Sequence, residues 1–264
     1  MRSQQRIRML LKAWTGKNSQ VQWVVAAVPG KEWAKQVFPE KSEAQAMESL
    51  WEAIFCAVRI QDGDAVQAWR EHDALLSEKC EILNKYQFTE LHYENEAGTD
   101  FRVGLVKNHI WEGGSEESGS GVRFIANMPT EEVFTMPDYR KAEGKVVSSR
   151  PLSYRGNLIK DFSLTFHEGK VVDFDAREGY DALKQLLDTD EGSKSLGEVA
   201  LVPYASPISE MGILFYNTLF DENASCHLAL GECYPTTVQD GEKMNEEELH
   251  QIGGNHSINH VDFM

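Results

Sequence analysis

The chain has 264 residues, of which 41% are hydrophobic and 26% are charged, and its formal net charge is −16. This composition is that of a globular protein long enough to bury a core, and it excludes an intrinsically disordered chain. So acidic a surface repels phosphate backbones, which argues against nucleic acid as a partner, and no apolar run approaches the roughly 20 residues that cross a bilayer.

The beginning of the chain is predicted to be mostly helical, with one strand. Apolar residues at helical spacing indicate a helix over 2–13, and 31–37 is predicted to form a short helix. Ser42 is a good helix N-cap, and Asp64 is placed to begin a further helix. The apolar, β-branched run over 21–28 is typical of a buried strand. We interpret this block as the end of an α/β domain.

From about residue 90 the pattern changes to strands and turns. Alternating or β-branched segments predict strands at 88–93, 100–106, 146–149, 157–166, 170–175 and 198–203. A loop rich in glycine, serine and glutamate is expected over 113–121, and one clear helix over 180–188. The predicted fold class is therefore α+β: a partial N-terminal α/β domain over 1–90, followed by a β-rich α+β domain over 91–264.

The four cysteines form no C-x-x-C pair. They are Cys56, Cys80, Cys226 and Cys233. Free thiols in a reducing compartment are therefore expected, which favours a cytoplasmic protein and argues against zinc held by thiolates. Cys226 stands beside His227, and we interpret it as a small buried hydrophobic residue and not as a nucleophile.

Carboxylates that could bind metal gather in the second half of the chain. Glu131 and Glu132 stand between Pro129 and Pro137, which excludes a long helix and predicts a short extended or turn segment. If the segment is extended, only one of the two can face a given pocket, and the sequence does not decide which. Glu198 lies in an otherwise apolar segment, where a carboxylate must be paired, protonated or metal-bound.

Histidines and further carboxylates follow towards the end of the chain: Asp221, Glu222, His227, His256, His260 and Asp262. His260 and Asp262 are two residues apart, so in a strand both side chains point to the same side. Imidazole with several carboxylates is the ligand set expected for zinc, cobalt or manganese. Taken singly, each residue is more simply explained as part of a surface pair, a loop carboxylate or a buried salt-bridge partner.

Other common catalytic patterns are missing from the sequence. It contains no G-x-S-x-G nucleophile motif, no P-loop lysine and no H-E-x-x-H zinc helix. The glycines of 113–121 lie in an acidic loop, which is unsuited to phosphate. The residues therefore allow a metal-dependent hydrolase of another kind.

Together, these segments resemble the aminopeptidase T / aminopeptidase S / PepS family of metallopeptidases. The stretches that carry the resemblance are NMPTEEVFT (127–135), GEVALV (197–202), SPI (206–208), FYNTLFDENASCHLALG (215–231) and GNHSINHVDFM (254–264). The likeness extends over essentially the whole chain, and family members are longer. The resemblance thus implies that the N-terminal domain is only partly represented and that the end of the catalytic domain is missing.

The resemblance implies a metalloaminopeptidase in which two divalent ions, zinc, cobalt or manganese, activate a water that removes N-terminal residues from peptides. The metal ligands that it implies are Glu132, Glu198, Glu222, His227, His260 and Asp262. It also implies catalytic roles for Glu222, as a proton shuttle, and for Tyr234, as a hydrogen-bond donor to the oxyanion.

A homodimer that acts on peptide substrates in the cytoplasm is the assembly that the resemblance implies. Neither nucleic acid nor a membrane is expected as a partner. Two alternatives stay open at this point. One is a truncated, non-catalytic relative that serves only as a metal-binding or dimerisation module, and the other is a metal-dependent hydrolase of non-peptide amides.

Overall fold

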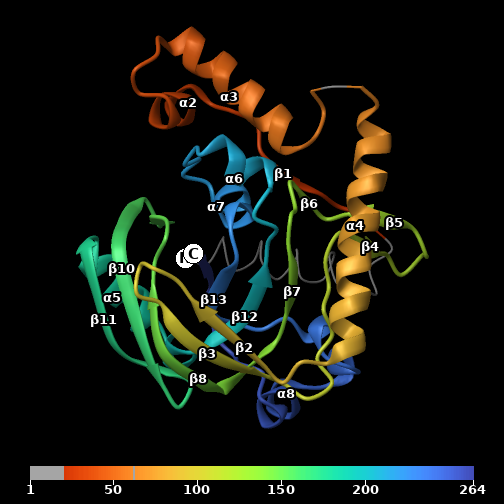
Figure 1. Cartoon of the computed structure of the whole chain (residues 1–264), viewed down its shortest axis with the longest axis vertical. Coiled ribbons are helices and arrows are strands. Elements are labelled where there is room, and N and C mark those ends of the chain that lie inside the picture. The colour runs from red at the N-terminus through yellow and green to blue at the C-terminus, as the bar shows by residue number, and fades with distance from the viewer. Residues whose placement is uncertain (1–20, 62) are drawn as a thin grey trace. The chain divides into compact units, whose positions relative to one another are not determined.

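The computed structural model describes residues 21–61 and 63–264, and the chain groups into two compact units of mixed helix and strand (Figure 1). The first unit comprises Met1–Ser77 and Gly113–Thr130, and the second comprises Glu78–Glu112 and Glu131–Met264. The chain therefore leaves the first unit and returns to it. The predicted domain boundary near residue 90 remains a prediction, and the helix predicted over 2–13 lies outside the described residues.

Helices carry much of the first unit. α2 (Lys31–Val37) and α3 (Glu43–Ala57) confirm two predicted helices. Ser42 closes a capping box at the start of α3, because its side chain accepts the backbone N–H of Gln45 while Gln45 reaches back to the Ser42 backbone. α4 (Ala65–Tyr86) begins after Asp64, whose carboxylate accepts the backbone N–H groups of the first turn, and it ends in the second unit.

The strand predicted over 21–28 is wrong in extent and in burial. Only β1 (Val25–Ala26) forms there, and Val21, Val24 and Val28 are 53%, 55% and 75% exposed. β1 pairs in parallel with β6 (Asn127–Met128) over two residues. A ladder this short does not cover the apolar side chains on either side of it.

The loop expected over 113–121 also contains a strand that sequence pattern did not predict. β4 (Ser115–Glu117) forms a hairpin with β5 (Arg123–Ile125). Asp73 ties the hairpin down, since its carboxylate accepts the Ser115 backbone N–H at 2.7 Å and pairs with Arg123 at 3.0 Å. Contacts from a distant helix therefore order a segment whose composition is typical of a loop.

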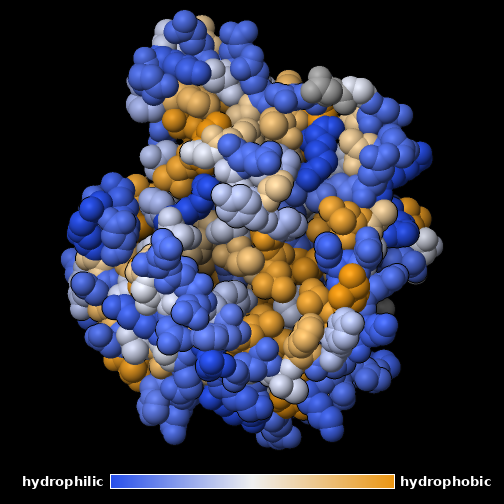
Figure 2. Space-filling model, viewed as in Figure 1, coloured by the Kyte–Doolittle hydropathy of each residue, from blue (hydrophilic) through white to orange (hydrophobic). Residues whose placement is uncertain are grey.

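A large antiparallel sheet dominates the second unit. Its six strands are β11 (Lys170–Glu178), β10 (Asn157–His167), β8 (Pro137–Val147), β3 (Asp100–Leu105) and β2 (Glu90–Glu94) in that order, with β9 (Leu152–Tyr154) paired to β10. The predicted strands are confirmed here, except that β8 begins well before the segment predicted at 146–149. In β10, Phe162, Leu164 and Phe166 alternate into the core, and Figure 2 shows the region over β8, β10 and β11 as mainly hydrophilic.

A smaller antiparallel sheet carries the candidate ligands. Its order is β14 (His260–Phe263), β13 (His227–Gly231), β12 (Leu196–Leu201) and β7 (Val133–Thr135). Every residue of β13 is buried, and the rings of Phe162 and Phe263 lie 5.9 Å apart, which brings β10 and β14 together. Glu198 and His227 on this sheet are buried, and His260 and Asp262 are partly buried.

Short helices complete the second unit. α5 (Tyr180–Leu187) confirms the one helix predicted in this half. The others are α6 (Pro207–Met211), α7 (Thr218–Asp221), α8 (Glu246–Ile252) and the 3-10 turns η1 (Glu191–Lys194), η2 (Glu222–Ala224), η3 (Pro235–Thr237) and η4 (Gly241–Lys243). These are too short to show a helical period. No membrane-spanning helix is found in the described part of the chain.

Candidate metal centre

Pairing in the smaller sheet brings two carboxylates side by side. Glu198 of β12 and Asp262 of β14 both pair with Ala229 of β13, one from each side. Cross-strand partners point to the same face of a sheet, so both carboxylates share a face with the small Ala229 side chain between them.

Both histidines belong to this same face. His227 lies two residues before Ala229, and His260 lies two residues before Asp262, so the strand period turns each imidazole towards the carboxylates. Their cross-strand partners are Ala200 and Gly231, which are small and leave room for the rings. The predicted same-side placement of His260 and Asp262 in a strand is confirmed.

The four side chains and Glu132 form two groups that share one member. Glu132, Glu198 and His227 offer donor atoms within 4.8 Å of one another, and so do Glu198, His260 and Asp262. Glu198 Oε1 lies 3.7 Å from His227 Nε2, and Glu198 Oε2 lies 3.7 Å from His260 Nε2. The shared carboxylate therefore turns one oxygen towards each group.

Backbone carbonyls fix the orientation of both imidazole rings. His227 Nδ1 lies 3.2 Å from the Ser225 carbonyl oxygen, and His260 Nδ1 lies 2.8 Å from the Glu232 carbonyl oxygen. A ring that donates its Nδ1–H to a carbonyl keeps Nε2 available to bind metal. In both groups Nε2 is the atom that faces the carboxylates.

Charges within the centre shift the pKa of its members in opposite directions. Burial alone would lower the pKa of His260, but the charge and hydrogen bond of Asp262 together with the charge of Glu198 outweigh it and raise that pKa to about 10. Burial would also lower the pKa of His227. The hydrogen bonds to Glu132 and Glu198 and the charge of Glu132 nevertheless raise that pKa well above its usual value. Burial raises the pKa of Glu198, whereas the positive charge of His260 holds the pKa of Asp262 below its usual value against burial. The imidazoles are thus poised to carry protons that compensate the carboxylates.

Comparison with known proteins decides the family. A model of the family described as thermophilic metalloprotease (M29) matches residues 2–264. The chain belongs to this family. The resemblance found in the sequence is thereby confirmed.

Relatives of this M29 chain are named aminopeptidases. It is 52% identical to aminopeptidase AmpS of Bacillus subtilis (strain 168) over 94% of this chain and 60% of that protein, and 43% identical to aminopeptidase T of Thermus aquaticus over 92% and 59%. The solved structure of wild-type AmpT from Thermus thermophilus matches with a TM-score of 0.88 and 41% identity, over 97% of this chain and 61% of that one. The M29 chain thus spans about three fifths of the length of these relatives.

The donor set of the M29 chain fits divalent metal. Glu132 Oε2 is buried and lies 2.9 Å from His227 Nε2. Three carboxylates, Glu132, Glu198 and Asp262, face only two imidazoles. Buried negative charge in excess of its counter-charges is what a bound cation would correct.

Glu222 and Tyr234 lie at the edge of this centre and belong to neither donor group. Burial and the nearby charges of Asp262 and Glu132 raise the pKa of Glu222 well above its usual value. The Tyr234 ring packs against the His260 ring, with centroids 4.7 Å apart and ring planes tilted by 53°. Burial of its hydroxyl, followed by the charges of Glu198 and Asp262, raises the pKa of Tyr234 well above the usual value.

The remaining candidates have other surroundings. Glu131 is buried but outside both groups, and its backbone N–H donates to the Asn223 side chain at 2.6 Å. Asp221 accepts the backbone N–H groups of Phe215 (2.7 Å) and Asn217 (2.9 Å) and so holds a turn. His256 pairs with Glu232 at 3.0 Å on the protein surface.

All four cysteines are free, and one of them differs from its prediction. Cys226 is exposed, whereas a buried hydrophobic residue was expected. It precedes the first residue of β13, so the burial that begins at His227 does not reach it.

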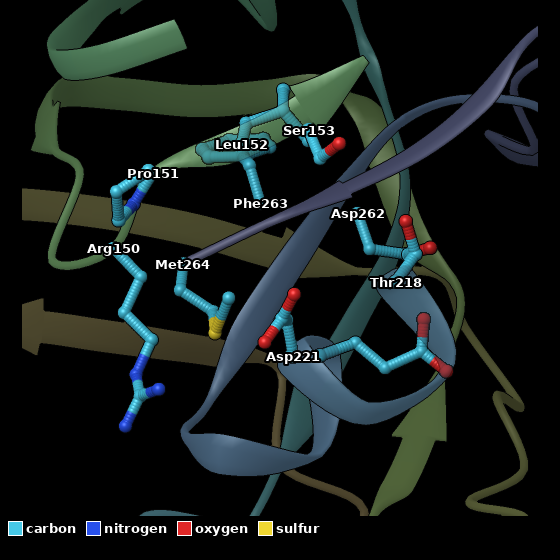
Figure 3. Close-up of a pocket in the computed structure, with 10 residues that line it drawn as sticks. Arg150, Pro151, Leu152, Ser153, Thr218, Asp221, Asp262, Phe263 and Met264 are labelled. Carbon is cyan, nitrogen blue, oxygen red and sulfur yellow. The ribbon is translucent and has the colours of Figure 1, made fainter. Parts of the chain in front are cut away.

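A pocket of about 310 Å³, solvent-open space included, adjoins the centre. Glu222 and Asp262 line one end of it, and Leu152, Phe263 and Met264 supply apolar surface. Figure 3 shows Arg150 on the side opposite Asp262, with Met264 between them. Sequence reasoning did not find Arg150 or Leu152, because nothing in their local pattern distinguishes them from ordinary strand-end residues.

Proposed function

We propose that this chain is the metal-binding part of an aminopeptidase that hydrolyses N-terminal residues from peptides at a centre of two divalent ions. The observation that carries the proposal is the shared carboxylate: Glu198 belongs to two groups of three donors, one oxygen towards each. A bridging carboxylate between two such groups is the arrangement expected of a two-metal hydrolase. Membership of a metalloprotease family and the names of the relatives support the substrate class.

Five residues would hold the ions. Glu132, Glu198 and His227 would bind the first, and Glu198, His260 and Asp262 the second. Imidazole nitrogen with carboxylate oxygen favours zinc, cobalt or manganese over calcium, which prefers more oxygen ligands. When bound, two such ions polarise a peptide carbonyl and lower the pKa of a water between them.

Glu222 is placed to move a proton. It lines the pocket together with Asp262 and lies outside both donor groups, so we assign it to proton transfer, although the resemblance also implied a ligand role. In that position it can take a proton from the attacking water and return it to the leaving amine. This assigns Glu222 as general base and acid and leaves it beside, not within, the ligand set.

Tyr234 is placed to stabilise negative charge on the carbonyl oxygen. Its ring packs between His260 and Phe134, at centroid distances of 4.7 Å and 5.9 Å, which fixes its direction. Its raised pKa keeps the phenol protonated at neutral pH, so that the hydroxyl acts as a donor.

The pocket is where the end of the peptide would lie. The apolar surface of Leu152 and Met264 suits the first side chain of a substrate, and Glu222 at the other end can hydrogen-bond to the α-amino group. That contact would favour a peptide with a free amino terminus over an internal peptide bond.

The wider setting follows from the family. We infer from the resemblance that the first unit belongs to an N-terminal domain and the second unit to the metal-binding domain. A homodimer and a cytoplasmic location are inferred from the resemblance, and the free cysteines are compatible with a reducing compartment. Analytical ultracentrifugation of the purified chain at several concentrations tests for the homodimer directly.

Metal analysis combined with turnover tests the proposed function. We expect two ions per chain after loading with zinc or cobalt, and release of the chromophore from an aminoacyl p-nitroanilide that stops with a chelator and resumes on adding metal. An N-acetylated form of the same substrate is the control and should not be cleaved. Metal binding without any turnover would identify the chain as a non-catalytic module, and absence of metal binding would contradict the proposal altogether.

A further inference from the structure

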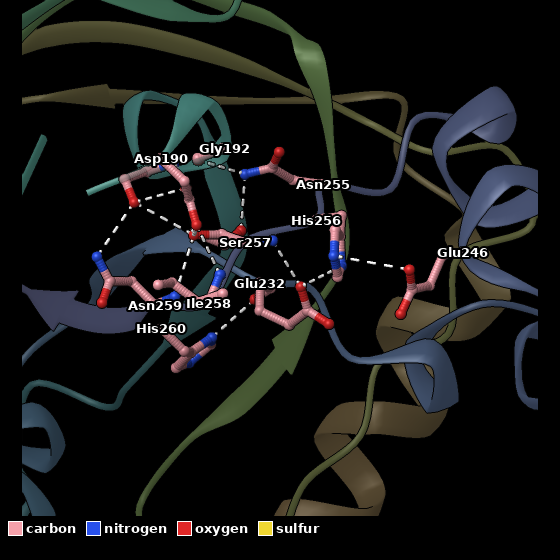
Figure 4. Close-up of polar contacts among 12 residues, drawn as sticks. Asp190, Gly192, Glu232, Glu246, Asn255, His256, Ser257, Ile258, Asn259 and His260 are labelled. Atoms are coloured by element: carbon pink, nitrogen blue, oxygen red, sulfur yellow. Dashed lines mark hydrogen bonds and ion pairs between the residues drawn. The ribbon is translucent and has the colours of Figure 1, made fainter. Parts of the chain in front are cut away.

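A polar network behind β14 is not used by the proposed reaction. Its centre is Asp190, the N-cap of η1, whose carboxylate accepts the Ser193 backbone N–H and the Ser193 hydroxyl, both at 2.8 Å. The same carboxylate reaches across to the segment before β14: the Ser257 hydroxyl donates at 2.8 Å and the Ile258 backbone N–H at 2.8 Å (Figure 4). Asp190 therefore holds Ser257 and Ile258 in place, shortly before His260 at the start of β14.

Asn255 fastens the start of the same segment. Its side-chain amide lies within donor distance of three backbone carbonyls, those of Gly192 (2.8 Å), Ser195 (3.1 Å) and Gly231 (2.7 Å). Gly231 is the cross-strand partner of His260. Asn255 is 4% exposed, so these bonds are made where water does not compete.

Glu232 connects this segment to the imidazole. Its backbone carbonyl accepts His260 Nδ1 at 2.8 Å, and its backbone N–H donates to the Asn259 carbonyl at 2.7 Å. Its side-chain carboxylate accepts the Ser257 backbone N–H at 2.7 Å. The residue that orients the His260 ring is thus itself bound to Ser257, which is bound to Asp190.

Gly197 packs closely against the Glu232 carbonyl group. A Cβ added to Gly197 would lie 2.2 Å from the Glu232 carbonyl oxygen and 2.3 Å from that of Gly231. Only a glycine leaves the Glu232 carbonyl where His260 needs it. Gly197 precedes Glu198, so the close approach stands beside the shared carboxylate.

We propose that Asp190, Ser257 and Glu232 are positioning residues that hold His260 and so set the metal affinity of the group formed by Glu198, His260 and Asp262, while the group containing His227 is independent of them. The inference rests on the proposed two-metal function. His227 supports the asymmetry, because its Nδ1 faces the Ser225 carbonyl and not any member of the network. Residues that orient metal ligands from behind change metal affinity by about 10- to 100-fold.

Two variants with a matched control test the proposal. Asp190→Asn removes the charge and one acceptor oxygen of the link between η1 and the segment before β14, and Ser257→Ala removes the hydroxyl that bonds to Asp190 but leaves the Ile258 bond. Asp73→Asn is the control, because Asp73 also accepts a serine backbone N–H (2.7 Å) and the hydroxyl of the same residue (3.1 Å), but belongs to the other unit. Ser257→Ala serves as the milder change if Asp190→Asn prevents folding.

The first measurement is nitrogen-15 NMR of the imidazoles in the metal-free chain, which does not depend on the proposed function. We expect the slowly exchanging Nδ1–H signal of His260 to broaden or disappear in both variants, while the His227 signal and both signals in Asp73→Asn stay unchanged. An unaltered His260 signal in both variants would overturn the positioning role.

The second measurement is calorimetric titration with cobalt, together with the visible spectrum of the bound ion. We expect one of two binding equivalents to weaken by about 10- to 100-fold in the variants and the other to stay within about threefold. Equal weakening of both equivalents, or of neither, would contradict the proposed asymmetry. Fewer than two equivalents in the wild-type chain would instead count against the two-metal function, and the NMR result would stand apart from it.

Discussion

The two sheets of the second unit differ in how exposed their charged side chains are and in which groups pair with them. In the large sheet, exposed charged residues pair across strands, as Arg102 does with Glu90 at 2.9 Å, where both side chains are about half exposed, and the buried Asp138 pairs with Arg140, which reaches the surface. In the smaller sheet, Glu198 is 4% and His227 2% exposed, and besides each other their partners are members of the same centre, His260 for Glu198 and Glu132 for His227.

The difference shows that the large sheet serves the fold, whereas the smaller sheet also carries the candidate metal site. Exposed pairs contribute little to stability, and a sheet can exchange them freely. Buried charges stabilise only as a set, and removing one member leaves another unpaired. The smaller sheet therefore carries an arrangement that stability alone does not explain, and five predictions follow from that contrast.

Glu198→Gln is expected to have the largest effect. The amide loses the charge and one of the two oxygens that face the donor groups, so both metal positions weaken by more than about 100-fold and turnover falls with them. Isothermal titration of the variant measures both positions. The control is Asp138→Asn, a buried carboxylate of β8 that pairs with Arg140 and should leave metal binding unchanged. Retention of either position at wild-type affinity would refute the shared role.

Tyr234→Phe is expected to keep metal and lose rate. Only the hydroxyl is removed, and the ring still packs on His260. We expect kcat to fall about 100-fold with unchanged metal content, as for loss of an oxyanion donor. Steady-state kinetics with an aminoacyl p-nitroanilide give the number, and a wild-type kcat would remove Tyr234 from the mechanism.

Gly197→Ala is expected to destabilise the smaller sheet by about 1–3 kcal/mol, because the new methyl group meets two backbone carbonyl oxygens that must move. Chemical denaturation of the metal-free chain measures the change. Gly156→Ala in the large sheet is the contrasting variant: nothing lies within 4 Å of its added Cβ, so only its φ of +80° opposes the change. A wild-type unfolding midpoint for Gly197→Ala would show that the approach is not tight.

Metal affinity is expected to rise with pH. In the metal-free chain the pKa values of His227 and His260 are raised, to about 10 for His260, so both rings carry protons at neutral pH that metal must displace. Each proton released makes the apparent affinity rise about tenfold per pH unit. Titrations between pH 6 and 8 test this, and a pH-independent affinity would contradict it. Because these pKa values lie above that of an unfolded histidine, their stabilisation of the metal-free fold is fully present below pH 6.5 and is lost as the pH rises towards about 10.

Arg102→Ala should have the smallest effect. Its pair with Glu90 is exposed, so we expect the free energy of unfolding to change by less than about 1 kcal/mol and metal binding not to change. Thermal unfolding of Arg102→Ala and Glu198→Gln, measured side by side, compares their losses of stability. A larger loss for Arg102→Ala than for the buried charges would remove the contrast between the two sheets.

Local signals explain which elements the sequence predicted. The predicted strand over 157–166 follows a turn in which Arg155 and Gly156 both have positive φ values, of 49° and 80°, the requirement of a two-residue hairpin turn. The strand prediction over 21–28 was wrong because burial of this segment depends on partners that the local pattern does not reveal. Short helices such as α7 failed because four residues show no period.

The candidate site was predicted only in part for a related reason. Residue type and the i, i+2 spacing identified His260 and Asp262, but the pairing of Glu198 and Asp262 with Ala229 joins segments far apart in the chain. Between Glu131 and Glu132 the residues alone could not choose, the family resemblance favoured Glu132, and the structure groups Glu132 with His227. Asp190 carried no signal at all, since its role depends on contacts 67 positions away with Ser257.

Anomalous diffraction from crystals of the cobalt-loaded chain tests the central claim most directly. Two anomalous peaks are predicted, one bounded by Glu132 and His227 and the other by His260 and Asp262, with the Glu198 carboxylate between them. A single peak, or two peaks of which only one touches Glu198, would contradict the account.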